Sequence, residues 1–415
     1  MTLLDKLNEP QTWQDFLAHK RAGGHWSRRE DAALEEFVNQ AGWRAVTAAI
    51  FSADPQPLGL PSRKLVNKLG GRKRVVYTFP AAQTWVLKLL AYLLYCYDDV
   101  HSPLCYSFRQ GTGAHAAIRQ LVRTPDIDSM WCYKLDVSDY FNSINVARLL
   151  PMLARILVDD QPLLAFFQRL LPACAPGAEE AVGVLPGTPT APFLANVYLG
   201  GLDRHFEATG LPYARYSDDI ILFAPTRSAI QEQRGFIHDF LEQMGLEVNA
   251  AKEHLLAPGE AWEFLGVSYR MGTVDLSQAT RQKLKGKIRR KARALRRWML
   301  RKQAQPEHAM KVMIRVFNQR FFDNPRPDEL TWARWFFPLL TSDAGLREMD
   351  AHLQRYIRYI PTGRHNAANY RVSYATLKRL GYRSLVHEWH NRGQTGGEGV
   401  KGGGSPGLPV TSARP

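Results

Sequence analysis

The stretch YARYSDDIILFA, residues 213 to 224, constrains the fold more than any other part of the sequence. Two apolar runs flank the adjacent acids Asp218 and Asp219, and the spacing leaves room only for a tight turn. Asp tolerates the backbone dihedral angles of such turns, so the pair alone fits a plain solvated β-turn. The flanking runs nevertheless predict two antiparallel strands, which place both carboxylates at the tip of a hairpin within a sheet.

A third carboxylate ends another apolar run. In MWCYKLDVSDYFNSI, residues 130 to 144, a β-prone segment reaches Asp136 and then breaks toward a helix. If this strand lies beside the hairpin, Asp136 meets Asp218 and Asp219, and three carboxylates repel each other unless cations lie between them. Mg²⁺ is a hard ion that takes oxygen ligands, and two such ions roughly 4 Å apart promote phosphoryl transfer to a 3′-hydroxyl. The three aspartates therefore predict a two-Mg²⁺ site.

Charge and cysteine content indicate the partner and the compartment. The chain has 54 Lys and Arg against 39 Asp and Glu, a net charge of +15, which favours nucleic acid first and an anionic membrane second. An ordinary basic protein remains an alternative. The four cysteines lack CxxC spacing and nearby histidine ligands, which favours reduced cytosolic thiols over zinc. The N-terminal residues lack the pattern of a signal peptide, so we expect a soluble cytoplasmic protein with no membrane contact.

The organisation along the chain predicts several regions of mixed α and β structure. Residues 1–60 are predicted to be helical, with a capping box at Ser27 and Glu30 ahead of an amphipathic run that ends near Ile50. LVNKLGGRKRVVYTFP predicts a hairpin, and residues 85–97 predict a buried helix that is too short to span a bilayer. Strand-like and helix-like segments then alternate to about residue 269.

The last third of the chain is predicted to be helical and basic. Residues 281–304 hold twelve Lys or Arg and no acid. Leu284, Ile288, Leu295 and Met299 recur at helical spacing, so one helix carries a narrow packing stripe and a broad cationic face. From residue 393 onward, Gly, Pro, Ser and Thr dominate, which predicts a disordered tail.

YSDD fits the YxDD motif of reverse transcriptases, and the blocks around it resemble those of that family in order over about residues 61–275. The sequence most resembles bacterial enzymes of the retron and group II intron type, and among these the "unknown group" that serves in anti-phage defence. The resemblance implies an α+β right-hand polymerase with an antiparallel-sheet palm. Its expected parts are an N-terminal extension (1–60), fingers (61–130), palm (131–275), basic helical thumb (276–392) and tail (393–415).

The resemblance also implies roles for residues of the palm. Asp136, Asp218 and Asp219 would be the catalytic, metal-binding aspartates, and Lys252 in NAAKEHLL would protonate the departing pyrophosphate. Phe141 matches the aromatic gate that disfavours ribonucleotides. The alternatives are an exposed amphipathic lysine for Lys252 and simple core packing for Phe141.

Three further blocks resemble substrate-contacting segments of the family. In NKLGGRKRVVYTF, Arg74 is the first choice and Lys68 the second for holding the incoming triphosphate, and a solvated basic turn is the alternative. In SFRQGTGAHAAI, Arg109 and His115 would face template or substrate, although His115 fits a core histidine equally well. In GVLPGTPTAPFLANVYL, Gly187 is kept while Pro186 stands where the family has glutamine, which brings template use into question.

The thumb and the partners complete the expectation. Phe264, Leu265 and Gly266 match the primer-grip turn, and the thumb helix would contact nucleic-acid phosphates through Lys287, Arg290 and Arg297. YIRYIPTGRHNAANYRVSY suits either unpaired RNA or aromatic packing. The expected partners are an RNA template (a dedicated non-coding RNA), dNTPs and a DNA product. A group II intron-type maturase, an RNA-binding scaffold and template-independent or protein-primed synthesis remain alternatives, and the sequence leaves the oligomeric state open.

Overall fold

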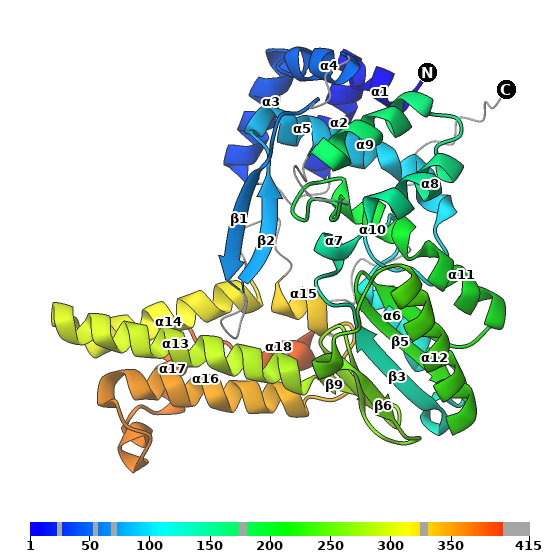
Figure 1. The fold of residues 1–415 in the computed structure, drawn as a ribbon. Helices are drawn as coiled ribbons and strands as arrows, with labels where there is room; N and C mark the ends of the chain where they lie inside the picture. The colour runs from blue at the N-terminus through cyan, green and yellow to red at the C-terminus, as the bar shows by residue number, and fades with distance from the viewer. Residues whose placement is uncertain (23–26, 53–56, 68–72, 174–180, 324–330, 393–415) are drawn as a thin grey trace. The chain divides into compact units, whose positions relative to one another are not determined.

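The computed structural model describes residues 1–22, 27–52, 57–67, 73–173, 181–323 and 331–392 (Figure 1). By internal contacts the chain divides into two compact units, Met1–Glu260 and Ala261–Pro415. The described residues form helices and three sheets, and the named strands of each sheet pair antiparallel. The predicted α+β class is therefore confirmed. The finer subdivision into fingers, palm and thumb stays a prediction, and the tail at 393–415 lies outside the described residues.

Four helices open the chain: α1 (Leu3–Lys6), α2 (Pro10–Ala22), α3 (Arg28–Asn39) and α4 (Trp43–Phe51). The predicted capping box is present, because the Ser27 hydroxyl accepts from the Glu30 N–H and the Glu30 carboxylate accepts from the Ser27 N–H. The amphipathic run that we expected to continue to Ile50 is instead two helices. Ala41 adopts a left-handed backbone (φ 51°) just after α3 ends, and the chain turns there before α4 begins.

The predicted hairpin follows. Strands β1 (Ser62–Asn67) and β2 (Lys73–Thr78) pair antiparallel, with Val66 opposite Arg74, and their connecting residues lie outside the described part. The apolar run at 85–97 forms α5 (Ala81–Leu93) and the start of a 3₁₀ segment, η1 (Leu94–Val100). Val86, Leu87, Leu89 and Leu90 have no exposed surface, so the predicted buried helix is confirmed. Among the described residues, no helix combines the length and apolar character needed to cross a membrane.

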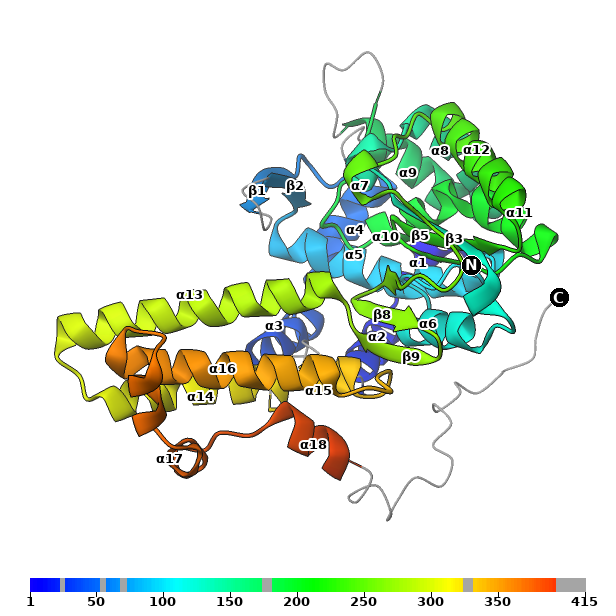
Figure 2. The same ribbon diagram turned by 90° about the horizontal axis from the view of Figure 1, so that it is seen from below.

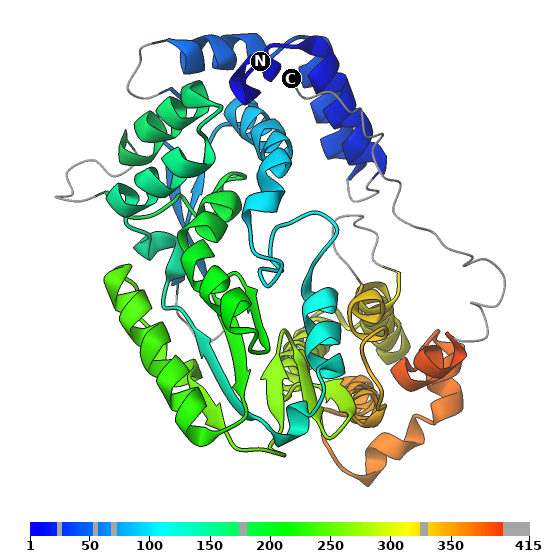
Figure 3. The ribbon, with the colours of Figure 1, turned by 90° about the vertical axis from the view of Figure 1, so that its right-hand side faces the viewer.

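The first unit centres on a four-stranded sheet in the order β4-β5-β3-β6. Its strands are β3 (Trp131–Asp136), β4 (Tyr213–Tyr216), β5 (Asp219–Ala224) and β6 (His254–Leu256). Helix α12 (Arg227–Gln243) packs along β3 and β5 (Figure 3). The unit's other elements are α6 (Ala114–Arg123), η2 (Ile127–Ser129), α7 (Tyr140–Ser143), α8 (Val146–Ile156), α9 (Gln161–Ala173), α10 (Ala191–Tyr198), α11 (Gly200–Thr209) and η3 (Ala250–Lys252).

The second unit opens with a three-stranded meander: β7 (Trp262–Phe264), β8 (Val267–Arg270) and β9 (Thr273–Leu276). The turn between β7 and β8 consists of Leu265 (φ 48°) and Gly266 (φ 91°), two positive angles that suit a two-residue hairpin loop. The Gly266 carbonyl accepts hydrogen bonds from the Ser277 N–H (3.0 Å) and the Thr280 hydroxyl (2.9 Å). The turn is thereby tied to the start of the next helix.

Helices make up the rest of the second unit: α13 (Gln278–Lys302), α14 (Pro306–Phe321), α15 (Trp332–Phe336), α16 (Ala344–Thr362), η4 (Ala367–Arg371), α17 (Tyr374–Arg379) and α18 (Leu385–Asn391). Helix α13 packs against both α14 and α16 (Figure 2). Its buried stripe consists of Leu284, Ile288, Ala292, Leu295 and Met299, which confirms the predicted packing face and adds one alanine.

Candidate active site

The hairpin of β4 and β5 forms as its sequence predicts. Tyr216 pairs with Asp219 across the turn, and Ser217 and Asp218 form the turn itself. Ser217 is buried and has a left-handed backbone (φ 62°), which is uncommon for a residue other than glycine. Such a conformation persists only where neighbouring groups hold it, so the contacts around this turn decide where Asp218 lies.

The strand ending in Asp136 lies next to this hairpin, as predicted. Strand β3 pairs with β5 so that Asp136 is directly opposite Asp219. The Val137 N–H also donates to the carbonyl of Asp218 (3.1 Å). Two segments 82 residues apart in sequence (218 − 136) thus bring three aspartates to one end of the sheet.

The electrostatics of these aspartates show a concentration of negative charge. Burial raises the pKa of Asp218, and the neighbouring charges of Asp136 and Asp219 raise it further, while Lys252 opposes them. Lys252 donates from Nζ to Oδ2 of Asp136 at 2.5 Å, and Lys134 lies 3.8 Å from Oδ1 of Asp219. Two lysines therefore supply the counter-charge in this conformation.

The carboxylates have the chemistry of a Mg²⁺ site. Mg²⁺ is commonly held by one or two carboxylates together with water and substrate phosphates, and the raised pKa of Asp218 indicates a position where a cation would relieve repulsion. Within the described part of the chain, no three His, Cys, Asp or Glu side chains are close enough together to hold one ion between them. Asp136 and Asp218 are the residues best placed to supply ligands, with Asp219 beside them.

Lys252 reaches the site from η3. Its carboxylate partner is the 6 % exposed Asp136, whereas the lysine side chain itself is 58 % exposed. The Asn249 side chain donates to Oδ1 of Asp136 (3.3 Å), and the Asn249 N–H donates to the carbonyl of the same residue (2.8 Å). The predicted lysine thus lies at the aspartate cluster, and Asn249 is a neighbour that the sequence had not indicated.

A fully buried ion pair lies beneath the turn and was missed from the sequence. Arg215 of β4 donates from Nε and Nη2 to the two oxygens of Asp203 in α11 (2.7 and 2.5 Å). Burial opposes the arginine's charge, but Asp203 outweighs it and the pKa of Arg215 is raised. Nη1 of Arg215 also donates to the carbonyl of Ser217 (3.2 Å). A charged residue inside the apolar run YARY was the available signal, because buried charges require partners.

The same network continues to a third segment. The Ser217 N–H donates to Oγ of Ser107 (2.9 Å), and Ser107 donates to Oδ1 of Asn196 in α10 (3.0 Å). The Asn196 amide donates back to the Ser107 carbonyl (2.7 Å). The Ser217–Asp218 turn is therefore held from both sides of its backbone by buried polar groups.

Arg109 points into the protein rather than toward a ligand. Nη1 donates to the carbonyls of Ser102 (2.7 Å) and Cys105 (3.2 Å), and Nη2 donates to that of Asp98 (3.2 Å). The side chain is 14 % exposed. This geometry favours a role in bracing the loop before α6, and the predicted contact with template gains no support. His115, in α6, is half-buried.

Gly187 meets the β1–β2 hairpin directly. The Pro186 carbonyl accepts a hydrogen bond from the Tyr77 N–H (2.7 Å), and a Cβ on Gly187 (φ 99°) would lie 3.0 Å from the Tyr77 carbonyl. The close approach that only glycine allows is thus made to β2.

The two residues predicted to hold the triphosphate belong to the same hairpin. Arg74 of β2 is exposed, as a triphosphate ligand must be, and Lys68 lies outside the described residues.

Phe141 is 9 % exposed and belongs to the hydrophobic core. Its ring meets that of Phe108 edge-on, with centroids 6.3 Å apart, and Phe108 is itself 42 % exposed with a positive φ of 57°. The ring centroid of Tyr216 also lies 6.2 Å from that of Phe108. The predicted gate residue therefore lies beneath an aromatic group that leads from the YSDD turn to the surface, and its gating role stays a prediction.

The predicted thumb contacts lie in the second unit, on α13. Arg290 and Arg297 are exposed and Lys287 is half-buried.

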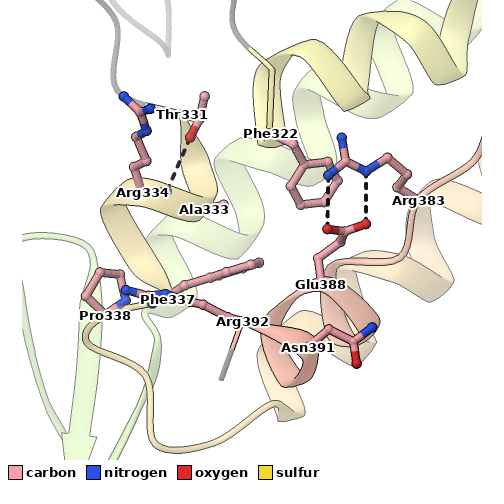
Figure 4. A pocket seen from close by; sticks show the side chains of 10 residues that line it. All are labelled: Phe322, Thr331, Ala333, Arg334, Phe337, Pro338, Arg383, Glu388, Asn391 and Arg392. Carbon is pink, nitrogen blue, oxygen red and sulfur yellow. Dashed lines mark hydrogen bonds and ion pairs between the residues drawn. The ribbon is translucent and has the colours of Figure 1, made fainter. Parts of the chain in front are cut away.

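Elsewhere in this unit, ten residues line a pocket of about 400 Å³ (Figure 4). One of its three arginines, Arg383, donates to both oxygens of Glu388 (2.9 Å each) and also pairs with Asp323 (2.8 Å). The other two, Arg334 and Arg392, are exposed.

Comparison with known proteins agrees with this geometry. Residues 66–269 match the family described as reverse transcriptase (RNA-dependent DNA polymerase). The retron Mx65 reverse transcriptase of Myxococcus xanthus is 28% identical over 185 residues, which cover 41% of this chain and 43% of the relative. The retron Ec86 reverse transcriptase of Escherichia coli is 24% identical over 238 residues, 54% of this chain and 67% of the relative. The chain thus spans less than half the length of the first of these relatives.

Among solved structures, the apo telomerase of Candida tropicalis is similar at a TM-score of 0.43 and 13% identity, over 79% of this chain and 60% of that one. The telomerase of Candida albicans with a fragment of telomeric RNA has a TM-score of 0.40 and 12% identity, over 77% and 63%. By sequence, residues 66–269 resemble a reverse transcriptase domain, and bacterial retron reverse transcriptases are similar to the chain at modest identity.

Proposed function

We propose that this protein is an RNA-directed DNA polymerase that adds dNTPs to a 3′-hydroxyl. The observation that carries the proposal is the meeting of Asp136, Asp218 and Asp219 at one end of the sheet, with the pKa of Asp218 raised by burial and by its neighbours. A site that concentrates negative charge in this way requires a bound cation to work near neutral pH. The reverse transcriptase domain supports the choice of reaction.

The chain's own residues have distinct tasks in this proposal. Asp136 and Asp218 would hold Mg²⁺, which supplies charge stabilisation of the transferring phosphoryl group when bound. Lys252 would leave its contact with Asp136, bind the pyrophosphate oxygens and donate a proton to them. Arg74 would bind the triphosphate, and Phe141 would disfavour a 2′-hydroxyl. The buried pair of Arg215 and Asp203 would keep the turn fixed while charges change above it.

We extend the proposal to biological context on the resemblance of the motif blocks. The protein would serve in anti-phage defence and copy a dedicated non-coding RNA. Pro186, which stands where the family has glutamine, favours template-independent synthesis as the second candidate. Proline has no amide side chain to offer to a base pair, and its backbone carbonyl accepts from the Tyr77 N–H of β2.

The direct test is primer extension on an RNA template with dNTPs and Mg²⁺. We expect Asp218→Ala and Asp219→Ala each to lower synthesis by about a thousandfold or more, because a transition state loses several kcal/mol of charge stabilisation. Asp239→Ala removes an exposed carboxylate of α12 and is the matched control, with full synthesis expected. Undiminished synthesis in both site variants contradicts the assignment.

The template is identified by sequencing the nucleic acid that copurifies with the protein and with the Asp218→Ala/Asp219→Ala double variant. DNA present only with the unaltered protein, and complementary to a bound RNA, supports a dedicated template. DNA of simple sequence without a complementary RNA favours template-independent synthesis. The same RNA in both samples, with no DNA in either, favours an RNA-binding or maturase function. Loss of phage resistance in cells carrying the double variant would support the defence role.

A further inference from the structure

The groove between α13 and α14 is the most distinctive surface that the catalytic proposal leaves unused. Six residues line a cavity of about 320 Å³: Lys291, Ala294, Leu295, Trp298, His308 and Val312. We refer to these as the α13–α14 groove. No carboxylate is among them. The rings of Trp298 and His308 lie 5.8 Å apart at 36°, and Trp298 is half-buried, so a flat aromatic surface forms part of the wall.

A second cavity adjoins this groove. It measures about 580 Å³ and shares His308 and Val312 with the first, so the two meet along α14. Its lining adds Lys311 and Arg315, both exposed and one helical turn apart. It also adds one acid, Asp323, which is paired with Arg383 at 2.8 Å. An apolar slot with an aromatic wall thus opens onto a track of positive charge.

The surrounding charge decides what can occupy the groove. Residues 278–321, which form α13 and α14 with their connection, contain fifteen Lys or Arg and a single acid, Glu307. That acid is paired with Arg379 at 3.0 Å. A second copy that docked through this same surface would be repelled, whereas a polyanion would be attracted. An occupant that combines a flat apolar group with a negative backbone meets both requirements.

We propose that the α13–α14 groove binds one unstacked base of a single-stranded RNA, with the flanking phosphates held by Lys291, Lys311 and Arg315. The inference rests on the proposed function, in which the protein binds RNA. It adds a contact with one unpaired base of that RNA, separate from the phosphate contacts of a template–primer duplex. Stacking on an aromatic side chain accepts any base, because every base has a π-face. The groove therefore grips RNA without reading its sequence.

The test uses the full chain without dNTPs and compares two labelled probes, a short single-stranded oligouridine and a blunt RNA duplex, by fluorescence anisotropy. Trp298→Ala should weaken single-strand binding by about tenfold, the loss expected when one base–aromatic stack is removed. Trp298→Phe keeps a ring and should stay within about threefold. Duplex binding should be unchanged in both. Equal losses on the two probes, or no loss on either, overturn the proposal.

The charged rim is tested separately. Lys311→Gln with Arg315→Gln should weaken oligouridine binding and flatten its salt dependence by about 1.4 in log–log slope, roughly 0.7 for each phosphate contact with a single strand. Arg347→Gln removes an exposed cation of α16 that is already paired with Asp343 and is the matched control. A control that changes binding as much as the rim variants shows non-specific charge attraction and overturns the rim's role.

A half-buried Trp298 could also be needed for folding, so a second measurement keeps the result decisive. Oligouridine carrying 4-thiouridine should crosslink to peptides of α13 or α14 in the unaltered protein, and crosslinks confined to the first unit overturn the proposal. If Trp298→Ala instead changes the oligomeric state in solution, the groove is a protein interface and RNA is the wrong occupant. Because no dNTP is present, these results stand whether or not the Asp218→Ala and Asp219→Ala variants retain synthesis, and the two proposals fail separately.

Discussion

The buried ion pair of Arg215 and Asp203 supports the turn that holds Asp218, a residue on which the proposed chemistry depends. Arg215 and Asp203 are 0 % and 1 % exposed, and the arginine also reaches the carbonyl of Ser217, whose left-handed backbone places Asp218. Tyr213 donates its hydroxyl to Asp203 as well (2.9 Å). Since a buried pair has already lost its hydration, it is stable only when both partners remain. The pair therefore fixes the turn and makes it sensitive to single changes.

We expect Arg215→Met or Asp203→Leu alone to lower the free energy of unfolding by about 3–5 kcal/mol, because each leaves an unpaired buried charge. The double variant replaces both charges with apolar groups and should recover most of that stability. It should not recover primer extension, since the bond from Arg215 to the Ser217 carbonyl stays lost. Urea unfolding and primer extension on the same samples check this, and full synthesis by the double variant would contradict the positioning role.

His101 gives a second prediction at this scale, concerning pH. Burial first, and then the charges of Arg109 and Arg215, together lower its pKa to about 4. The folded pKa lies below the ordinary value of 6.5, so the unfolded chain binds the proton more readily between these values. The stability that depends on neutral His101 is complete above about pH 6.5 and is lost as the pH falls toward 4.

From the size of this shift, the loss is at most about 3 kcal/mol across that window. His101→Phe keeps a ring against Phe193 and should flatten the decline of unfolding free energy between pH 6.5 and 4, as measured by urea unfolding. Part of the slope should persist, because burial also lowers the pKa of His19 and His352. An unchanged slope in His101→Phe would show that His101 titrates normally.

At the scale of elements, the loop at Gly187 is hydrogen-bonded to strand β2 of the β1–β2 hairpin, within the first unit. Gly187→Ala places a Cβ 3.0 Å from the Tyr77 carbonyl at a φ of 99°, so we expect a loss of about 1–3 kcal/mol and weaker protection of the Tyr77 amide from hydrogen exchange. Gly210→Ala is the matched control, because Gly210 has a φ of 67° but nothing within 4 Å of its Cβ position. It should cost about 1–2 kcal/mol and leave the Tyr77 amide protected. Equal exchange in the two variants would mean that the close approach is unimportant.

The elements also show what the sequence could and could not predict. The aspartates were predictable because an apolar strand that stops at an acid is visible in sequence, and α13 was predictable from helical spacing of its apolar residues. The partner of Arg215 was not, because Asp203 lies on α11 and only the packing of that helix on β4 joins them. The inward turn of Arg109 was equally hidden, since its acceptors are backbone carbonyls, which no residue type reveals.

At the scale of the whole molecule, the net excess of positive charge belongs to one unit. Residues 261–415 hold 29 Lys and Arg against 11 Asp and Glu, a net charge of +18. Since the chain carries +15, residues 1–260 carry −3 (15 − 18). The unit with Asp136, Asp218 and Asp219 therefore has no net positive charge with which to attract a polyanion. In the proposed function, the second unit supplies the net attraction for nucleic acid, and we expect the salt dependence of binding to follow from it.

This division of charge predicts how salt and substitution combine. Arg290→Gln with Arg297→Gln removes two exposed cations of α13 and should weaken binding of a template–primer duplex most at low salt. The log–log slope of affinity against salt should flatten by about 1.5–2, since each phosphate contact with a duplex contributes roughly 0.9. Arg347→Gln with Arg379→Gln removes the same charge from exposed positions that are already paired with Asp343 and Glu307. The slope in that control should hardly change, because an arginine neutralised by a carboxylate releases few counterions. Equal flattening in the two double variants would mean that only net charge matters, and α13 would then have no particular role in holding the duplex.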